Sequence, residues 1–420
     1  MEAEIINKCS ESVTIQVTIP LNGNMLSTEE IIQKSVNQVG LLATEYALSQ
    51  FDTDGTPIEV GQKKYTSKGQ LSKTYQCPFG EFELFRHVYQ SNEGGSTYSP
   101  LDNDARILVY STPKFAKMVS SKYSSSSTRE VQTDLADNHS RSISRTYIQD
   151  ISDAVGKVAS SKPWKYTTGV ESSEVSSVGI SLDGTCMLLR NDGWRQAMVG
   201  SISLYDEEGE RLHTSYIAHS PEYGKEKFLD EFAKEIAATK QLYPEKEKTY
   251  VGVADGATDN WKFLKQHTQM EVLDFYHATE YLAKVSKTAF KRKFEGNDWL
   301  KQSRHTLKYE KDGAQALLQE MQEMLKKKIS KAKKEEIEKS ITYFTNHLHQ
   351  MNYSSNLSKK LPIGSGVIEA ACKVIVKQRM CNSGMRWTEE SAKNVLILRC
   401  FNKTDRRWNQ FWDKCQRWGY

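Results

Sequence analysis

The chain has 420 residues, with 38% apolar and 26% charged side chains and a net charge of +4. This length accommodates two or three domains with sizeable cores. Its apolar runs are too short to cross a bilayer and its first residues lack the pattern of a signal peptide, so we expect no membrane association. The seven cysteines include no Cys-x-x-Cys pair, which argues against a zinc ribbon or disulfide framework and fits a reducing cytoplasm.

The charge is unevenly distributed along the chain. Residues 281–420 hold 29 basic and 14 acidic side chains, a net charge of +15, whereas residues 1–280 carry −11. A basic C-terminal third beside an acidic remainder suggests a surface that binds a polyanion. For the lysine-rich run at 326–339, the alternative is a solvated charged helix.

The first 113 residues mix strand and helix patterns. Residues 12–19 place apolar side chains at every second position, as a half-buried strand does. Helical spacing follows over residues 27–42, and residues 72–90 predict a hairpin that turns at Cys-Pro-Phe-Gly, 77–80. We therefore expect an N-terminal α+β region over residues 1–113.

Residues 114–160 predict short helices. Two of them, at 128–138 and 144–156, are joined by His-Ser-Arg-Ser-Ile, and Ser142 or Ser144 would cap the second. This pattern is typical of a helix-turn-helix segment that binds DNA, in which Arg141 and Arg145 would contact phosphates or base edges. A plain structural pair of helices explains it equally well.

Residues 176–276 predict a mixed sheet. Strand patterns at 177–182, 196–205 and 211–218 are followed by a helix at 224–242 and by strands at 249–254 and 271–275. Three strands, a helix and two further strands are the order of an RNase H-like α/β fold, which we predict for residues 176–277.

The remaining chain is predicted to be largely helical. Residues 278–361 read as a lysine-rich, all-α insertion that is interrupted at Gly296 and Gly313. Helical sequence resumes at Val367 and again at 389–401. We therefore expect residues 362–420 to complete the RNase H-like core and to add C-terminal helices.

Three acidic residues stand at breaks in these patterns. Asp183 and Asp255 each end an apolar run and precede a glycine, which predicts carboxylates exposed at strand ends. Glu369 lies where a Gly-Ser-Gly loop enters a helix that can bring it over the same sheet edge. Carboxylates gathered in this way suit Mg²⁺, and a pair of such ions promotes displacement at phosphorus. Taken singly, the two aspartates are turn residues, and Glu369 is a helix acid that pairs with Lys373.

Other acids compete for these roles. Asp192 and Asp206 fall at turns beside the second predicted strand, and Asp259 and Asp274 follow the later strands. His277 follows Asp274 in Leu-Asp-Phe-Tyr-His, so it either lines the site or is a polar residue at a strand-to-helix turn.

Basic and aromatic residues accompany the third acid. Lys373, Lys377 and Arg379 follow Glu369 on its predicted helix, where they would contact phosphates or balance nearby acids. The pair Arg386 and Trp387 combines a guanidinium with a ring that could stack on an unpaired base, or the tryptophan covers a helix end.

Several of these motifs resemble those of bacterial insertion-sequence transposases of the ISKra type, a DDE group allied to Mutator-like elements. Asp-Gly-Thr-Cys-Met-Leu-Leu-Arg, which opens residues 183–200, resembles the first-acid block. Val-Ala-Asp-Gly-Ala at 253–257 and Leu-Asp-Phe-Tyr-His-Ala at 273–278 resemble the second-acid block with its carboxylate-x-x-His companion. Pro-Ile-Gly-Ser-Gly-Val-Ile-Glu-Ala-Ala-Cys-Lys at 362–373 and Ser-Gly-Met-Arg-Trp at 383–387 resemble the third-acid block.

The resemblance implies an enzyme that cleaves insertion-sequence ends and transfers 3′-OH strands to target DNA. Asp183, Asp255 and Glu369 would bind Mg²⁺, which Mn²⁺ can replace, and His277 would assist. It further implies binding to terminal inverted repeats, a homodimer or higher oligomer on DNA, and a nucleoid-associated place in the cytoplasm. Two alternatives stay open: a catalytically silent, transposase-derived DNA-binding regulator, and an RNase H-like structure-specific nuclease.

Overall fold

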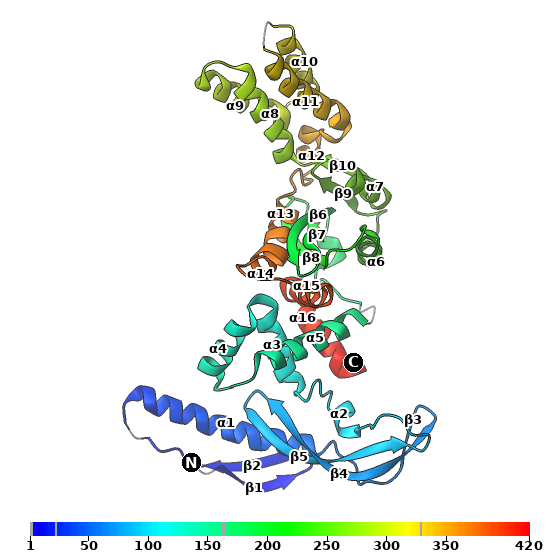
Figure 1. Ribbon diagram of the computed structural model, residues 1–420. Coiled ribbons are helices and arrows are strands. Elements are labelled where there is room, and N and C mark those ends of the chain that lie inside the picture. Colours follow the sequence, from blue (N-terminus) through cyan, green and yellow to red (C-terminus); the bar gives the residue numbers. More distant parts are fainter. Residues whose placement is uncertain (1–2, 22, 162–164, 328–329) are drawn as a thin grey trace. The chain divides into compact units, whose positions relative to one another are not determined.

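The computed structural model describes residues 3–21, 23–161, 165–327 and 330–420 (Figure 1). The chain forms two compact units. Unit 1 comprises Met1–Trp164, Ile397–Asn402 and Trp408–Tyr420, and unit 2 comprises Lys165–Leu396 and Lys403–Arg407. Residues 1–160 thus fall in unit 1, the expected core and helical segments of 176–361 fall in unit 2, and the C-terminal residues are divided between them.

Unit 1 contains two small antiparallel sheets and several helices. Their bounds are β1 (Ala3–Cys9), β2 (Ser12–Val17), α1 (Met25–Ser49), β3 (Ile58–Val60), β4 (Lys63–Cys77), β5 (Gly80–Ser91), α2 (Pro100–Asp104), α3 (Pro113–Ser125), α4 (Thr128–His139) and α5 (Arg145–Ser161). β1 pairs with β2, and β3, β4 and β5 form a three-stranded sheet. The predicted hairpin is confirmed, because β4 and β5 pair up to Cys77 opposite Gly80.

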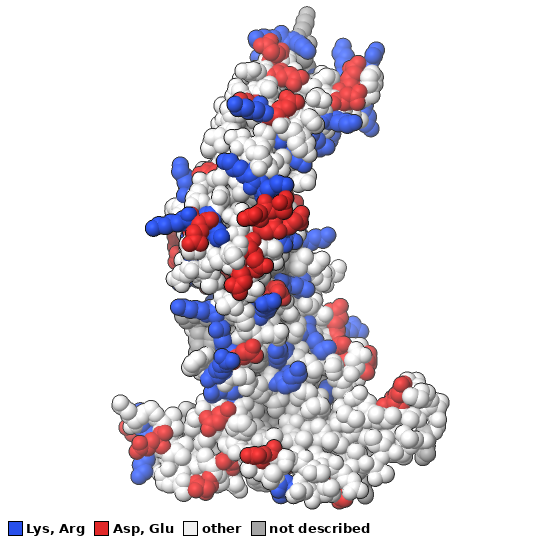
Figure 2. Space-filling view, turned by 180° about the vertical axis from the view of Figure 1, so that it is seen from behind, with Lys and Arg blue, Asp and Glu red and all other residues white. Residues whose placement is uncertain are grey.

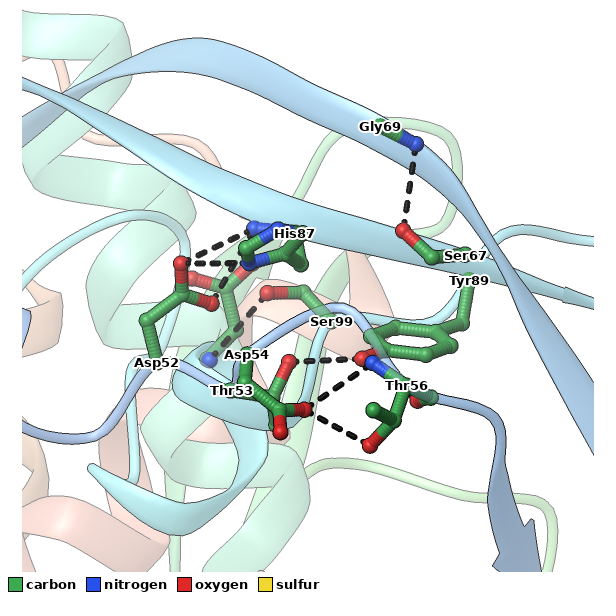
Figure 3. Close-up of polar contacts among 10 residues, drawn as sticks. Asp52, Thr53, Asp54, Thr56, Ser67, Gly69, His87, Tyr89 and Ser99 are labelled. Carbon is green, nitrogen blue, oxygen red and sulfur yellow. Dashed lines mark hydrogen bonds and ion pairs between the residues drawn. The ribbon is translucent and has the colours of Figure 1, made fainter.

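The segment after α1 is fastened to β5 by side-chain hydrogen bonds (Figure 3). Asp52 accepts a hydrogen bond of 3.0 Å from the backbone N–H of His87 and lies 3.0 Å from the Nδ1 atom of the same residue. The hydroxyls of Thr53 and Tyr89 lie 2.6 Å apart. Since His87 and Tyr89 both belong to β5, these contacts hold the segment against the three-stranded sheet.

The pair α4 and α5 is present as predicted. α4 begins with a capping box between Ser127 and Glu130, which satisfies two N–H groups of the helix end. Of the two expected caps for α5, Ser144 accepts a hydrogen bond of 3.1 Å from the N–H of Tyr147. The structure thus confirms the helices, while their contact with DNA stays a prediction.

Unit 2 is built on a five-stranded mixed sheet, which confirms the predicted α/β class. Its strands are β6 (Ser177–Leu189), β7 (Gly193–Tyr205), β8 (Arg211–His219), β9 (Thr249–Ala254) and β10 (Met270–Leu273). They lie in the order β10-β9-β6-β7-β8. β6, β7 and β8 are antiparallel, whereas β9 pairs in parallel with β6 and β10 in parallel with β9.

Two helices between the later strands provide the core beside this sheet. They are α6 (Glu226–Leu242) and α7 (Thr258–His267). Phe228 and Phe232 of α6 are fully buried, and the ring of Phe232 stacks on those of Phe228 and Phe263 with 5.6 Å between centroids in each pair. These stacked rings join both helices to the hydrophobic core of unit 2.

A helical insertion follows β10. It consists of α8 (Phe275–Ala289), α9 (Lys293–Tyr309), α10 (Gly313–Leu325), α11 (Lys331–His347), the 3₁₀ turn η2 (Leu348–Gln350) and α12 (Tyr353–Ser358). Gly313 begins a helix as expected, but Gly296 does not break one, because it lies inside α9. A Cβ atom there would lie 2.9 Å from the carbonyl oxygen of Ser286, so this glycine permits α8 and α9 to pack closely.

The chain then returns to the sheet through one interrupted helix. α13 (Gly366–Ala371) continues into a π-helical segment, η3 (Cys372–Lys377), and into α14 (Gln378–Met380). α15 (Glu389–Lys403) and α16 (Arg407–Trp418) end the chain. Among the helices of the described residues, none combines the length and apolar character that a membrane crossing needs.

Replacing Phe232 by Ala tests the assigned core. We expect Phe232→Ala to lower the free energy of unfolding by about 3–5 kcal/mol, because it leaves a cavity among the stacked rings. Urea denaturation of the whole chain measures the loss. The matched control is Phe294→Ala, since Phe294 is 60% exposed. Equal losses in the two variants would contradict this core.

Candidate metal centre

Three aspartates lie beyond the last paired residues of three neighbouring parallel strands. The β6–β9 ladder pairs Ser177 with Thr249, and continuing its register brings Asp183 level with Asp255. The β9–β10 ladder ends at Leu273 opposite Ala254, so the next pair is Asp274 with Asp255. Side chains at one level of a parallel sheet project to the same face. The strand register therefore places three aspartates at the same edge of the sheet.

Asp255 follows β9 directly, as predicted, but Asp183 does not end its strand. β6 continues through Gly184 to Leu189, because its hairpin with β7 runs on to the pair of Leu189 with Gly193. Asp183 instead lies beyond the last residue of β6 that pairs with β9, Ile180. The Asp-Gly sequence, which favours a turn, is held extended here by the pairing with β7.

The loop before α13 brings Glu369 to the same edge. The N–H of Phe275 donates to the carbonyl of Ile363 at 3.0 Å, and the N–H of Ser365 donates to a carboxylate oxygen of Asp274. The hydroxyl of Ser365 then donates to Glu369 at 2.8 Å. Asp274 is thus the anchor to which the segment that carries Glu369 is tied.

The ligand atoms of Asp274, His277 and Glu369 lie within 4.8 Å of one another and could hold a metal ion. No group this close within the described residues includes Asp183 or Asp255, so the predicted triad of Asp183, Asp255 and Glu369 is not brought together at that distance. Asp274 is fully buried at the start of α8, where its carboxylate also accepts a hydrogen bond of 2.6 Å from the N–H of His277. His277 is half-buried and Glu369 exposed. The group is therefore buried at Asp274 and open to solvent at Glu369.

Electrostatics link Asp183 to this group. Burial raises the pKa of Asp183, and the charge of Asp255 raises it further, while His277 opposes the shift. Burial also raises the pKa of Cys372 well above its usual value, so the thiol stays protonated. Its Sγ atom donates to Asp183 at 3.7 Å. The carboxylates of Asp183 and Asp255 repel each other in a partly desolvated environment. A bound divalent cation would relieve this repulsion.

The donor set fits such a cation. Carboxylate oxygens with one imidazole nitrogen are ligands that Mg²⁺ and Mn²⁺ accept, the imidazole favouring Mn²⁺. Asp183, Glu369 and Cys372 line a pocket of 660 Å³ together with Lys373 and Lys377. Cys372, Lys373 and Lys377 all belong to the π-helical segment, a distortion that is frequent at functional sites.

The residues expected to contact DNA divide into two groups. Arg145, Lys373, Lys377 and Arg386 are exposed. Arg141, Arg379 and Trp387 are buried, which corrects the expectation that they meet DNA.

The buried members have internal partners instead. Arg141 donates to the carbonyl of Cys77 at 3.1 Å, and the indole N–H of Trp387 donates to the carbonyl of Met380 at 2.9 Å. The guanidinium of Arg379 lies 4.9 Å from the ring centroid of Trp387. These side chains therefore stabilise the fold, in line with the alternative interpretation of Trp387 as the cover of a helix end.

The face of the protein in Figure 2 carries basic side chains interspersed with acidic ones, and no single uninterrupted basic surface covers it. The basic excess of residues 281–420 is therefore not expressed as one broad patch on that face. Among the exposed basic residues, Lys373 and Lys377 are the strongest candidates for phosphate contacts, because they line the same pocket as Asp183 and Glu369.

Asp274 is the site residue that sequence reasoning left among the rival acids. Its local signal is that it directly follows a strand, β10, as Asp255 directly follows β9. Ser365 and Cys372 carried no such signal, because their contacts with Asp274 and Asp183 join residues far apart in the chain.

No protein-family model matches this chain, and no curated protein is detectably similar to it in sequence.

The pH dependence of stability tests the assigned electrostatics. Because the folded state raises the pKa of Asp183, its protonated form contributes stability below the unfolded pKa, near 3.9, that is lost as the pH rises through the folded value. We expect metal-free Asp183→Asn to melt at a higher temperature than the wild type at pH 7. The difference should shrink as the pH is lowered towards 4. A melting temperature below that of the wild type at pH 7 would refute the repulsion.

Proposed function

We propose that this protein is a metal-dependent DNA transposase of the DDE type, with an RNase H-like core in unit 2. The observation that supports this best is the close group of Asp274, His277 and Glu369 at the sheet edge that also carries Asp183 and Asp255. The strand order β10-β9-β6-β7-β8 and the helical insertion before Glu369 support the same proposal. They agree with the order of motifs in the resemblance to ISKra-type transposases.

The position of each residue indicates its role in the proposed reaction. Asp274, His277 and Glu369 are close enough to share an ion, and Asp183 and Asp255, at the same edge of the sheet, would complete the binding of Mg²⁺ or Mn²⁺. When bound, a pair of such ions activates the attacking oxygen and stabilises the leaving oxygen in displacement at phosphorus. Asp274 holds the loop before Glu369 in place.

The pocket lined by Asp183 and Glu369 has positive charge on one wall. Lys373 and Lys377 lie on the helical segment next to Glu369 and line the pocket with it. Their ammonium groups would hold the phosphates of a DNA strand next to the acids and offset the negative charge there. DNA ends and target DNA are thus the proposed substrates, and an oligomer that joins two ends is the proposed active form.

A cleavage and joining assay tests this function. Purified protein is incubated with Mg²⁺ and the DNA flanking its own gene, and nicks and joined strands are mapped at nucleotide resolution. We expect cuts at the ends of the element and joined 3′ strands. Asp183→Asn and Asp255→Asn should lower cleavage on the order of 100-fold and leave DNA binding intact, because only ion binding is removed.

The control is Asp259→Asn, since Asp259 is an exposed acid on α7 that pairs with Lys262 at the surface. It should cleave as the wild type does. Bound but uncut DNA in both Mg²⁺ and Mn²⁺ would favour a DNA-binding regulator, and cuts without joined strands would favour a structure-specific nuclease. Either result would overturn the transposase assignment.

A further inference from the structure

Two tyrosines of the helical insertion reach the ends of the strands that carry the acids. The hydroxyl of Tyr343, on α11, donates to the backbone carbonyl of Asp255 at 3.0 Å. The hydroxyl of Tyr353, which begins α12, donates to the carbonyl of Leu273 at 3.0 Å. Leu273 directly precedes Asp274, so each hydroxyl holds the backbone at or next to a carboxylate of the candidate centre.

These hydrogen bonds satisfy backbone carbonyl groups that have no partner in the sheet. A backbone carbonyl that is removed from water needs a hydrogen-bond partner. The β9–β10 ladder stops at the pair of Leu273 with Ala254, so the backbone beyond it must find partners elsewhere. The insertion supplies two of them as phenol hydroxyls on rigid rings.

The positions of both rings are fixed by packing. Tyr343 stacks on Tyr281 with 3.8 Å between centroids and 11° between planes. Tyr353 is 1% exposed and meets the ring of Phe275 edge-on, with 5.3 Å between centroids. A ring held in this way can transmit the position of its helix to the carbonyl that its hydroxyl binds.

The turn after Asp255 is shaped to admit this contact. Gly256 has a φ of +100°, and a Cβ atom there would lie 3.1 Å from the hydroxyl of Tyr343 and 3.3 Å from Nε2 of His347. α11 therefore approaches the backbone next to Asp255 as closely as a glycine permits. A third hydrogen bond, of 2.7 Å from Gln350 to Glu271, ties the insertion to β10.

We propose that the helical insertion positions the metal-binding carboxylates, with Tyr343 and Tyr353 as positioning residues for Asp255 and Asp274. The insertion is then part of the metal centre. This inference rests on the proposed metal centre. It gives the two hydroxyls the role of positioning the carboxylates, in addition to the packing of their rings.

Calorimetric titration of Mn²⁺ into the metal-free full-length protein, without DNA, tests the inference. Tyr343→Phe and Tyr353→Phe keep the rings and remove only the hydroxyls, so we expect each to bind Mn²⁺ about 10-fold more weakly than the wild type. Tyr309→Phe is the matched control, since Tyr309 is 57% exposed on α9, and should bind as the wild type does. Thermal melting of each variant in EDTA reports on folding separately.

The outcomes distinguish this inference from the proposed function. Unchanged Mn²⁺ affinity in both variants, with a lowered melting temperature, would show a purely structural role and overturn the inference while the metal centre stands. A wild type that binds no Mn²⁺ would overturn the metal centre and the inference with it. If Tyr353→Phe does not fold, the affinity of Tyr343→Phe decides.

Discussion

The parallel pairing of β9 with β6 and of β10 with β9 is the constraint on which the candidate centre depends. It brings three aspartates, contributed by separate parts of the chain, to one edge of a sheet. Parallel strands need long connections: β7, β8 and α6 connect β6 to β9, and α7 connects β9 to β10. Glu369 joins the row only because the chain returns from the insertion and hydrogen-bonds to Asp274.

Bringing acidic side chains together opposes folding because their charges repel one another. Hydrogen bonds from neighbouring groups offset part of this repulsion. Asp274 accepts two backbone N–H groups, and the thiol of Cys372 donates to Asp183. Asp183 keeps a raised pKa nevertheless, since burial and the charge of Asp255 both act against ionisation. A centre whose repulsion is only partly compensated by its own residues is typical of one that receives a cation.

Much of unit 2 could be predicted from the sequence, because its strands are apolar runs with clear ends. The sequence patterns predict β8, β9 and α6 close to where they lie, and in unit 1 they predict the helix pair α4 and α5. Neighbour relations were harder, since no local pattern shows that Asp274 falls level with Asp255. Asp183 was placed at a strand end because Asp-Gly favours turns, whereas pairing with β7 extends the strand.

Burial and long-range hydrogen bonds were the other limits. A basic side chain looks the same in sequence whether it faces DNA or packs inside, and Arg141 and Arg379 pack inside because their guanidinium groups find partners there. The tyrosine contacts join residues 88 and 80 positions apart, with no local signal. The sequence thus predicts the acidic residues of the centre better than the tyrosines and loop residues that position them.

The most direct measurement is the anomalous scattering of a crystal of the protein grown with Mn²⁺. The account predicts density for at least one ion within coordination distance of Glu369 and of Asp183, Asp255 or Asp274. Crystals of Asp183→Asn should show that density weakened or absent. Well-ordered carboxylates without an ion, or ions bound only elsewhere on the protein, would contradict the central claim.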